Sequence, residues 1–241
     1  METACTTFLL DIEGTVSPVA FVYDVMFPYA RQHVAGYLES GWEDPDTRDA
    51  VQWLARDEGH ENAEAWFAGQ AADTDPLRQE MVVRSVHRLM DEDAKLTGLK
   101  KLQGLVWRRG FEDGRLVSTL FPDVLENLRH WKQAGRSLCI YSSGSVAAQR
   151  LFFGHTRTGD LGDLFSGFFD TTWGPKKQAA SYRAIADELG EPPATICFVS
   201  DITDELDAAR EAGMQTVLRA AGPTETDHPV ITGFDEIRLV R

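Results

Sequence analysis

Two acids separated by one residue follow an apolar stretch near the start of the sequence. In "FLLDIEGTVSP", residues 8–18, the apolar run ends at Asp11, and Glu13 comes two residues later. One carboxylate can attack phosphorus and form an acyl phosphate. A second acid nearby can protonate the leaving oxygen and then activate water. Because an Asp after a strand is also a common turn former, the pair gains meaning only from other residues placed near it.

Three further apolar runs end in residues that suit the same chemistry. "CIYSSGS" ends in Ser142 and Ser143, "FFDTTWGPKK" leads to Lys176 and Lys177, and "CFVSD" ends in Asp201. Carboxylates and phosphate oxygens are hard ligands for Mg²⁺, and hydroxyl and ammonium groups can hold phosphate oxygens. In a parallel sheet, ligands bind beyond the carboxyl ends of the strands. The four strand ends therefore predict a site for a phosphate ester.

The runs that carry these residues alternate with helical patterns. Short apolar runs at 8–11, 138–145, 196–201 and 216–219 are separated by stretches such as "PDVLENLRHWKQAG" and "SYRAIADELG". Strand, helix, strand, helix is typical of a parallel sheet with helices on both faces. We therefore predict an α/β, Rossmann-like core.

Residues 28–112 have a different pattern, with helical spacing and no convincing strand. We interpret them as an all-helical domain inserted after the first strand, so that residues 1–27 and 113–241 form the α/β core. An insertion directly after a catalytic strand can act as a lid.

Composition limits the partners. Acids exceed bases by 38 − 24 = 14, which argues against nucleic acid or an anionic membrane, and an anionic substrate would need a local cation. No apolar run approaches the roughly 20 residues of a membrane helix, and no secretory signal is visible. Cys139 and Cys197 lie in apolar runs, which favours reduced, buried cysteines in a cytoplasmic protein.

Four motifs in order, "DIEGT", "YSSGS", a lysine near "GPK" and "SDITDE", resemble those of the haloacid dehalogenase superfamily of phosphatases. The helical insertion is similar to the cap of one major subgroup. Most members have Asp-x-Asp in the first motif, whereas Glu13 occupies the second position here. With the longer stretches "LQGLVWRRGF" and "SSGSVAAQRLFFGHTRTGDL", this narrows the resemblance to the enolase-phosphatase (acireductone synthase) branch of methionine salvage, over nearly the whole chain.

The resemblance implies roles for the acids. Asp11 would be the nucleophile and a metal ligand, and Glu13 the acid/base, with its backbone carbonyl on the metal. Asp201 would be the remaining protein ligand of one Mg²⁺ per subunit. Glu205 could support the site, and the choice between Glu205 and Asp204 stays open.

The resemblance also implies the substrate contacts and the reaction. Ser142 and Ser143 would bind the substrate phosphate, as would Lys176, which follows Gly174 by two residues as in the family's Gly-x-Lys. The expected reaction is enolisation and then dephosphorylation of 2,3-diketo-5-methylthiopentyl-1-phosphate, which yields an acireductone. We expect a monomer that acts on this small phosphate ester.

Other interpretations remain open. A receiver-like domain also clusters acids, a hydroxyl and a lysine, but it lacks such an insertion; an ordinary capped phosphatase for another small phosphate is the third possibility. Ser142 and Ser143 could cap a helix that starts near Val146. We interpret His155 as structural and Trp107 as part of the insertion's core.

Overall fold

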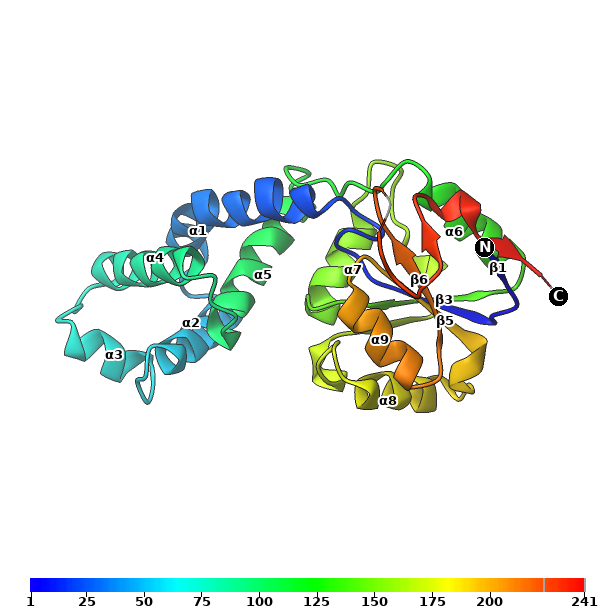
Figure 1. Ribbon diagram of the computed structural model, residues 1–241. Helices are drawn as coiled ribbons and strands as arrows, with labels where there is room; N and C mark the ends of the chain where they lie inside the picture. Colours follow the sequence, from blue (N-terminus) through cyan, green and yellow to red (C-terminus); the bar gives the residue numbers. More distant parts are fainter. Residues whose placement is uncertain (223, 241) are drawn as a thin grey trace. The chain divides into compact units, whose positions relative to one another are not determined.

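The strands of the main sheet are all parallel, as the alternating pattern predicts (Figure 1). The computed structural model describes residues 1–222 and 224–240, and in these residues the sheet has six strands in the order β4-β3-β2-β5-β6-β7. Its strands are β2 (Thr7–Leu10), β3 (Ser137–Tyr141), β4 (Gly167–Phe169), β5 (Ile196–Ser200), β6 (Gln215–Arg219) and β7 (Val230–Ile231). A separate parallel pair joins β1 (Glu2–Thr3) to β8 (Arg238–Leu239) near the two chain termini.

The first apolar run becomes the centre of this sheet because both of its faces are covered. Every residue of β2 is buried, with β3 on one side and β5 on the other. Leu10 is in register with Ile140 of β3 and Val199 of β5, so these three strands end at the same edge. The residues that follow them are thereby brought close together.

Helices cover both faces of the sheet, since successive side chains of a strand point to opposite sides. They are α6 (Val124–Gln133), α7 (Val146–Gly154), α8 (Ala179–Leu189) and α9 (Thr203–Glu211). Phe8 stacks on Trp131 of α6, with ring centroids 3.9 Å apart. Leu9 packs instead into the cluster that includes Ile185 of α8 and Leu206 of α9. Burying each such side chain stabilises the fold by about 1.5–3 kcal/mol.

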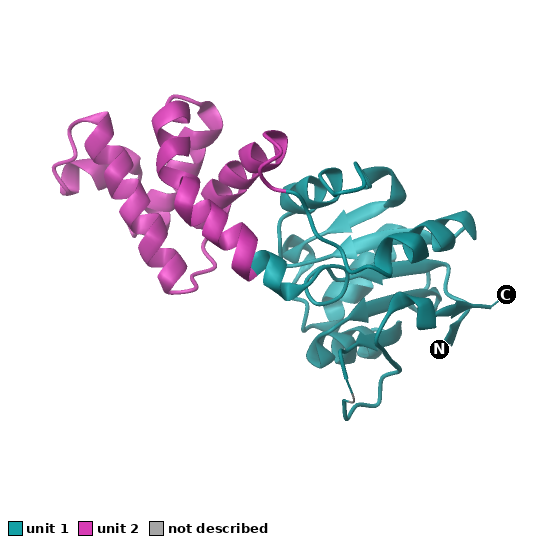
Figure 2. Ribbon diagram, turned by 90° about the horizontal axis from the view of Figure 1, so that it is seen from above, with its two compact units in different colours: residues 1–22, 117–241 teal, residues 23–116 magenta. Residues whose placement is uncertain are grey.

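The inserted segment forms a compact helical unit of its own, residues 23–116 (Figure 2). It begins at Tyr23 rather than at residue 28 and ends at Leu116 rather than at residue 112. Its helices are α1 (Phe27–Gly41), α2 (Pro45–Asp57), α3 (Ala63–Gly69), α4 (Asp75–Asp91) and α5 (Thr97–Glu112). Their apolar faces share a separate core, in which Leu38, Leu54 and Leu102 are completely buried.

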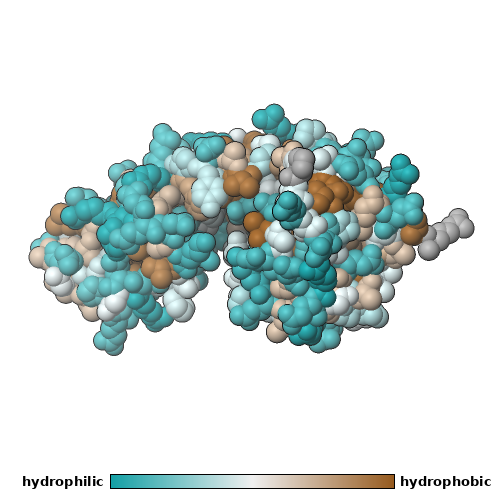
Figure 3. Space-filling view, in the orientation of Figure 1, coloured by the Kyte–Doolittle hydropathy of each residue, from teal (hydrophilic) through white to brown (hydrophobic). Residues whose placement is uncertain are grey.

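Short helical turns complete the chain. A π-helical segment, η1 (Phe21–Met26), precedes α1 and contains the change from one unit to the other. The 3₁₀ turns are η2 (Gly162–Leu164), η3 (Thr171–Trp173), η4 (Pro193–Thr195) and η5 (Phe234–Glu236). The face in Figure 3 is mainly hydrophilic, in keeping with the net charge of −14. Within the described part of the chain, no helix has the length and apolar character needed to cross a membrane.

Candidate active site

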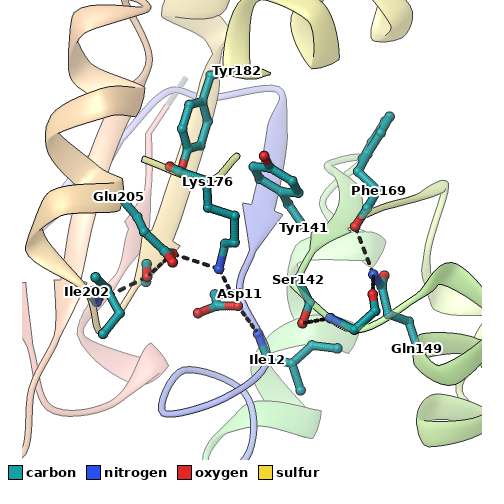
Figure 4. A network of polar contacts seen from close by, with 12 residues as sticks. Asp11, Ile12, Tyr141, Ser142, Gln149, Phe169, Lys176, Tyr182, Ile202 and Glu205 are labelled. Atoms are coloured by element: carbon teal, nitrogen blue, oxygen red, sulfur yellow. Dashed lines mark hydrogen bonds and ion pairs between the residues drawn. The ribbon is translucent and has the colours of Figure 1, made fainter. Parts of the chain in front are cut away.

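Asp11 lies directly after the central strand β2 and is only 5% exposed (Figure 4). Its backbone N–H donates to the Val199 carbonyl at 3.0 Å, which continues the β2–β5 pairing up to the acid. Its Oδ1 accepts from the backbone N–H of Ile12 at 2.8 Å and pairs with Lys176 Nζ at 2.7 Å. Among the described residues, the polar contacts of this carboxylate all fall on Oδ1. Oδ2 is therefore the oxygen available to a substrate.

Lys176 is the buried cation of this site, 9% exposed. Its Nζ lies 2.7 Å from Asp11 Oδ1 and 2.7 Å from Glu205 Oε2. Burial opposes the charged form, but the charges of Asp11 and Glu205 outweigh it and raise the pKa of Lys176 above its usual value. Tyr182 Oη donates to the Lys176 carbonyl at 2.6 Å and fixes the backbone. Lys176 is thus held as an ammonium between two acids.

The neighbouring Lys177 has a different environment. It lies at the surface, where its Nζ pairs with Asp204 at 2.8 Å. Asp204 is equally exposed, so neither residue reaches the buried cluster. Of the two lysines that follow Gly174, the structure brings only Lys176 to Asp11.

From the sequence we expected Glu205 only to support the site. In the structure it pairs directly with Lys176. It lies in the first turn of α9, is 8% exposed, and accepts from Ser200 Oγ at 3.0 Å as well as from Lys176. Burial raises the pKa of Glu205, partly offset by Lys176. Its position four residues after Asp201 was the available signal, since Asp201 directly follows β5 and α9 starts two residues later, at Thr203.

Asp201 follows β5 and approaches the loop that carries Glu13. Gly14 has a φ of +71°, and a Cβ there would lie 2.1 Å from Asp201 Oδ2, so only glycine fits at this position. Burial, and next the charge of Asp11, raise the pKa of Asp201 to about 6. The loop itself is a tight turn in which the Ile12 carbonyl accepts from the N–H groups of Val16 and Ser17.

Ser142 and Ser143 follow β3 and leave the sheet at the edge where Asp11 does. Ser142 is buried, and its Oγ accepts weakly from Gly144 N–H at 3.4 Å, while Ser143 is exposed. Neither caps α7. Ser145 is the cap, because its Oγ accepts from the Ala148 N–H at 3.3 Å.

Trp107 and His155, which we did not assign to the site from the sequence, both make contacts that support the fold. Trp107 packs against the core of the helical unit and donates its indole N–H to the Met26 carbonyl at 2.8 Å. His155 directly follows α7, and its Nδ1 lies 2.9 Å from the Leu151 carbonyl.

The donor set suits a hard cation. Among the described residues, no three His, Cys, Asp or Glu side chains gather as a metal site. The predicted set needs only two side chains, Asp11 and Asp201, together with the Glu13 backbone carbonyl. Burial and, next, the charge of Asp11 raise the pKa of Asp201, and a cation bound beside the two acids would offset both effects. Oxygen donors of this kind fit Mg²⁺.

A protein-family model and known proteins of similar sequence both point to one family of hydrolases. A sequence model of the haloacid dehalogenase-like hydrolases matches residues 5–213. The chain is 44% identical to "Enolase-phosphatase E1" of Aquifex aeolicus, over 96% of this chain and 98% of that protein. It is also 44% identical to the protein of that name from Synechococcus elongatus, over 98% and 99%.

Solved structures give the same fold. The crystal structure of the UTR4 protein of Saccharomyces cerevisiae is similar, with a TM-score of 0.75 and 29% identity, over 96% of this chain and 99% of that one. A dehalogenase structure has a TM-score of 0.54 at 19% identity, over 97% and 95%, which is a likeness of fold alone.

Proposed function

Because this chain belongs to the haloacid dehalogenase-like hydrolases and, within them, to the enolase-phosphatase E1 family, we propose that it is the bifunctional enolase-phosphatase of methionine salvage. Its substrate is 2,3-diketo-5-methylthiopentyl-1-phosphate, and its product is the acireductone 1,2-dihydroxy-3-keto-5-methylthiopentene. The observation that supports this most strongly is Asp11, which is held through Oδ1 at the end of the central strand, with no polar contact of Oδ2 seen among the described residues.

We assign the dephosphorylation steps to Asp11 and Glu13, the two acids of the first motif. Asp11 Oδ2 forms a bond to phosphorus as the phosphorus–oxygen bond to the substrate breaks, and Glu13 gives its proton to the leaving oxygen. Glu13 then takes a proton from water, which attacks the aspartyl phosphate, releases phosphate and restores Asp11. Lys176 holds the Asp11 carboxylate in place, because its ammonium lies 2.7 Å from Oδ1.

Phosphate binding and enolisation use the same edge of the sheet. Ser142 and Ser143 bind the phosphate oxygens together with Lys176. The proton lost during enolisation comes from the phosphate-bearing carbon, whose neighbouring carbonyl takes up the charge. Asp11, Asp201 and the Glu13 carbonyl would hold Mg²⁺, which would supply positive charge near the phosphate and the enolate oxygen.

The remaining features of the proposal concern the protein as a whole. We place it in the cytoplasm as a monomer with one Mg²⁺ per subunit and with no nucleic-acid or membrane partner. The net charge of −14 supports the absence of polyanionic partners. The three cysteines, all buried and unpaired, are in keeping with a reducing compartment.

Removal of the metal is expected to abolish phosphate release. In the metal-free enzyme, Lys176 faces Asp11, Glu205 and Asp201, so the local charge is negative and repels a phosphate. The measurement is phosphate release from the diketo phosphate before and after chelation, and again after Mg²⁺ is restored. Full activity in the metal-free enzyme would contradict the assignment of Asp11 and Asp201 as ligands.

Replacing Glu13 by Gln is expected to slow phosphate release by about 10²–10⁴-fold, the usual contribution of general acid/base catalysis. Metal binding should persist, because the ligand at this position is the backbone carbonyl. Steady-state kinetics and a Mg²⁺ titration of Glu13→Gln would test both points. The control is Glu188→Gln, an exposed acid on α8, which should match the wild type. A wild-type rate in Glu13→Gln would show that this side chain is not the acid/base.

A further inference from the structure

Arg219 is a second buried cation at the edge of the sheet, and the proposed chemistry does not use it. It ends β6, the strand predicted from the run "TVLR", and is 7% exposed. Its guanidinium donates to Asp123 Oδ1 at 2.8 Å, to Asp123 Oδ2 at 3.0 Å and to the Thr15 carbonyl at 3.0 Å. The aromatic rings of Phe121 and Phe234 lie near it, with centroids 4.1 and 5.1 Å from Cζ.

Both carboxylate oxygens of Asp123 accept hydrogen bonds from Arg219. It stands at the start of α6, yet its side chain makes no capping hydrogen bond to that helix. Burial opposes its ionisation, but the hydrogen bonds from Arg219 and from the Phe234 N–H lower the pKa of Asp123 overall. The two-fold contact with Asp123 neutralises the guanidinium, so Arg219 does not serve as a phosphate anchor.

Arg219 also donates a hydrogen bond to the loop that carries Glu13, the proposed acid/base. Thr15, whose carbonyl accepts from Arg219, lies two residues after Glu13. The next carbonyl, that of Val16, accepts from the Phe121 N–H at 3.0 Å, and the Phe121 ring lies over the same guanidinium. Two successive carbonyls of the loop are therefore fixed by Arg219 and by the residue stacked on it.

We propose that Arg219, held by Asp123, is a positioning residue that fixes the loop carrying Glu13 for leaving-group protonation and water attack. This inference rests on the proposed function of Glu13. Lysine cannot replace the arginine, because a single ammonium lacks the planar fork that spans both Asp123 oxygens and the Thr15 carbonyl. A displacement of about 1 Å at a reacting group can cost on the order of 10²-fold in rate.

The test is a double-mutant cycle with Arg219→Lys and Glu13→Gln, measured as kcat and KM for phosphate release in the presence of Mg²⁺. We expect Arg219→Lys to lower kcat by about 10- to 100-fold with KM little changed. In the Glu13→Gln background, the same change should cost less than about threefold, because the group that it positions is already gone. The control is Arg183→Lys, an exposed arginine that also bonds a carbonyl and a carboxylate, with wild-type kinetics expected.

A role in folding alone gives a different pattern. It would lower kcat by the same factor in both backgrounds, and that result, or a wild-type kcat in Arg219→Lys, overturns the inference while leaving the proposed function intact. A wild-type rate in Glu13→Gln alone overturns the role of Glu13 and the inference with it. If Arg219→Lys does not fold, Asp123→Asn replaces it in the cycle, with a smaller loss of kcat but the same dependence on Glu13 expected.

Discussion

The Asp11→Asn variant is expected to form the enol but to release no phosphate, so that the phosphorylated enol accumulates. An amide of the same size keeps the shape of the site but cannot attack phosphorus, and loss of a catalytic nucleophile costs on the order of 10⁶-fold in rate. Enolisation does not need the bond from Asp11 to phosphorus. The measurement follows enol absorbance and free phosphate in the same reaction.

The matched control is Asp204→Asn. Asp204 is an exposed acid whose carboxylate pairs with Lys177 at the surface, so this variant should carry out both steps at the wild-type rate. Release of phosphate by Asp11→Asn at a rate near that of the wild type would rule out Asp11 as the nucleophile.

The second large effect is expected from Lys176→Met. Removing the ammonium leaves Asp11 and Glu205 buried without their shared partner, and breaking such a buried pair costs about 3–5 kcal/mol. We expect the thermal midpoint of unfolding to fall by roughly 10 °C. Phosphate release should fall by about 10³-fold or more, because Asp11 loses the ammonium that pairs with its Oδ1 and holds the carboxylate in place.

The adjacent Lys177→Met separates this effect from a general loss of positive charge. Lys177 is exposed and pairs with Asp204 at the surface, where solvent screens the two charges, so this pair should contribute little to stability. Thermal unfolding and steady-state kinetics of the two variants, side by side, should show a defect in Lys176→Met alone. Equal behaviour of the two would contradict the arrangement of the buried cluster.

The sequence was sufficient to predict a parallel sheet and the residues that follow its central strands, whereas β7 was not predicted. Buried parallel strands are nearly continuous apolar runs, and their carboxyl ends meet at one edge, so the positions of Asp11, Ser142 and Asp201 follow from the residues after each run. Family resemblance was needed to choose Lys176 over Lys177, because both follow the same loop. Burial now separates the two, since only Lys176 is inside the cluster.

Other features were not accessible from sequence because they depend on contacts between distant residues. An arginine at the end of a strand is ordinarily exposed, and the partner of Arg219, Asp123, lies 96 residues away in the chain. The alternative that Ser142 or Ser143 caps α7 is wrong, because the cap is Ser145, whose Oγ accepts from the Ala148 N–H.

From the net charge we expected a local cation that binds the substrate phosphate. Lys176 is the cation proposed for this role, but it also pairs with two buried acids. The overall charge of −14 calls for positive charge where a phosphate binds. Lys176 alone does not provide it, because its charge is shared between Asp11 and Glu205. This balance is the physical reason to expect a strict need for Mg²⁺ in the phosphatase step.

We infer that one protein carries out both steps on one substrate. The most direct test is to follow enol absorbance and free phosphate together, with the wild-type protein, Mg²⁺ and 2,3-diketo-5-methylthiopentyl-1-phosphate. The account predicts that enol absorbance rises first and that phosphate then appears in an amount equal to the acireductone formed. Release of phosphate with no enol at any time would contradict the account and leave a plain phosphatase.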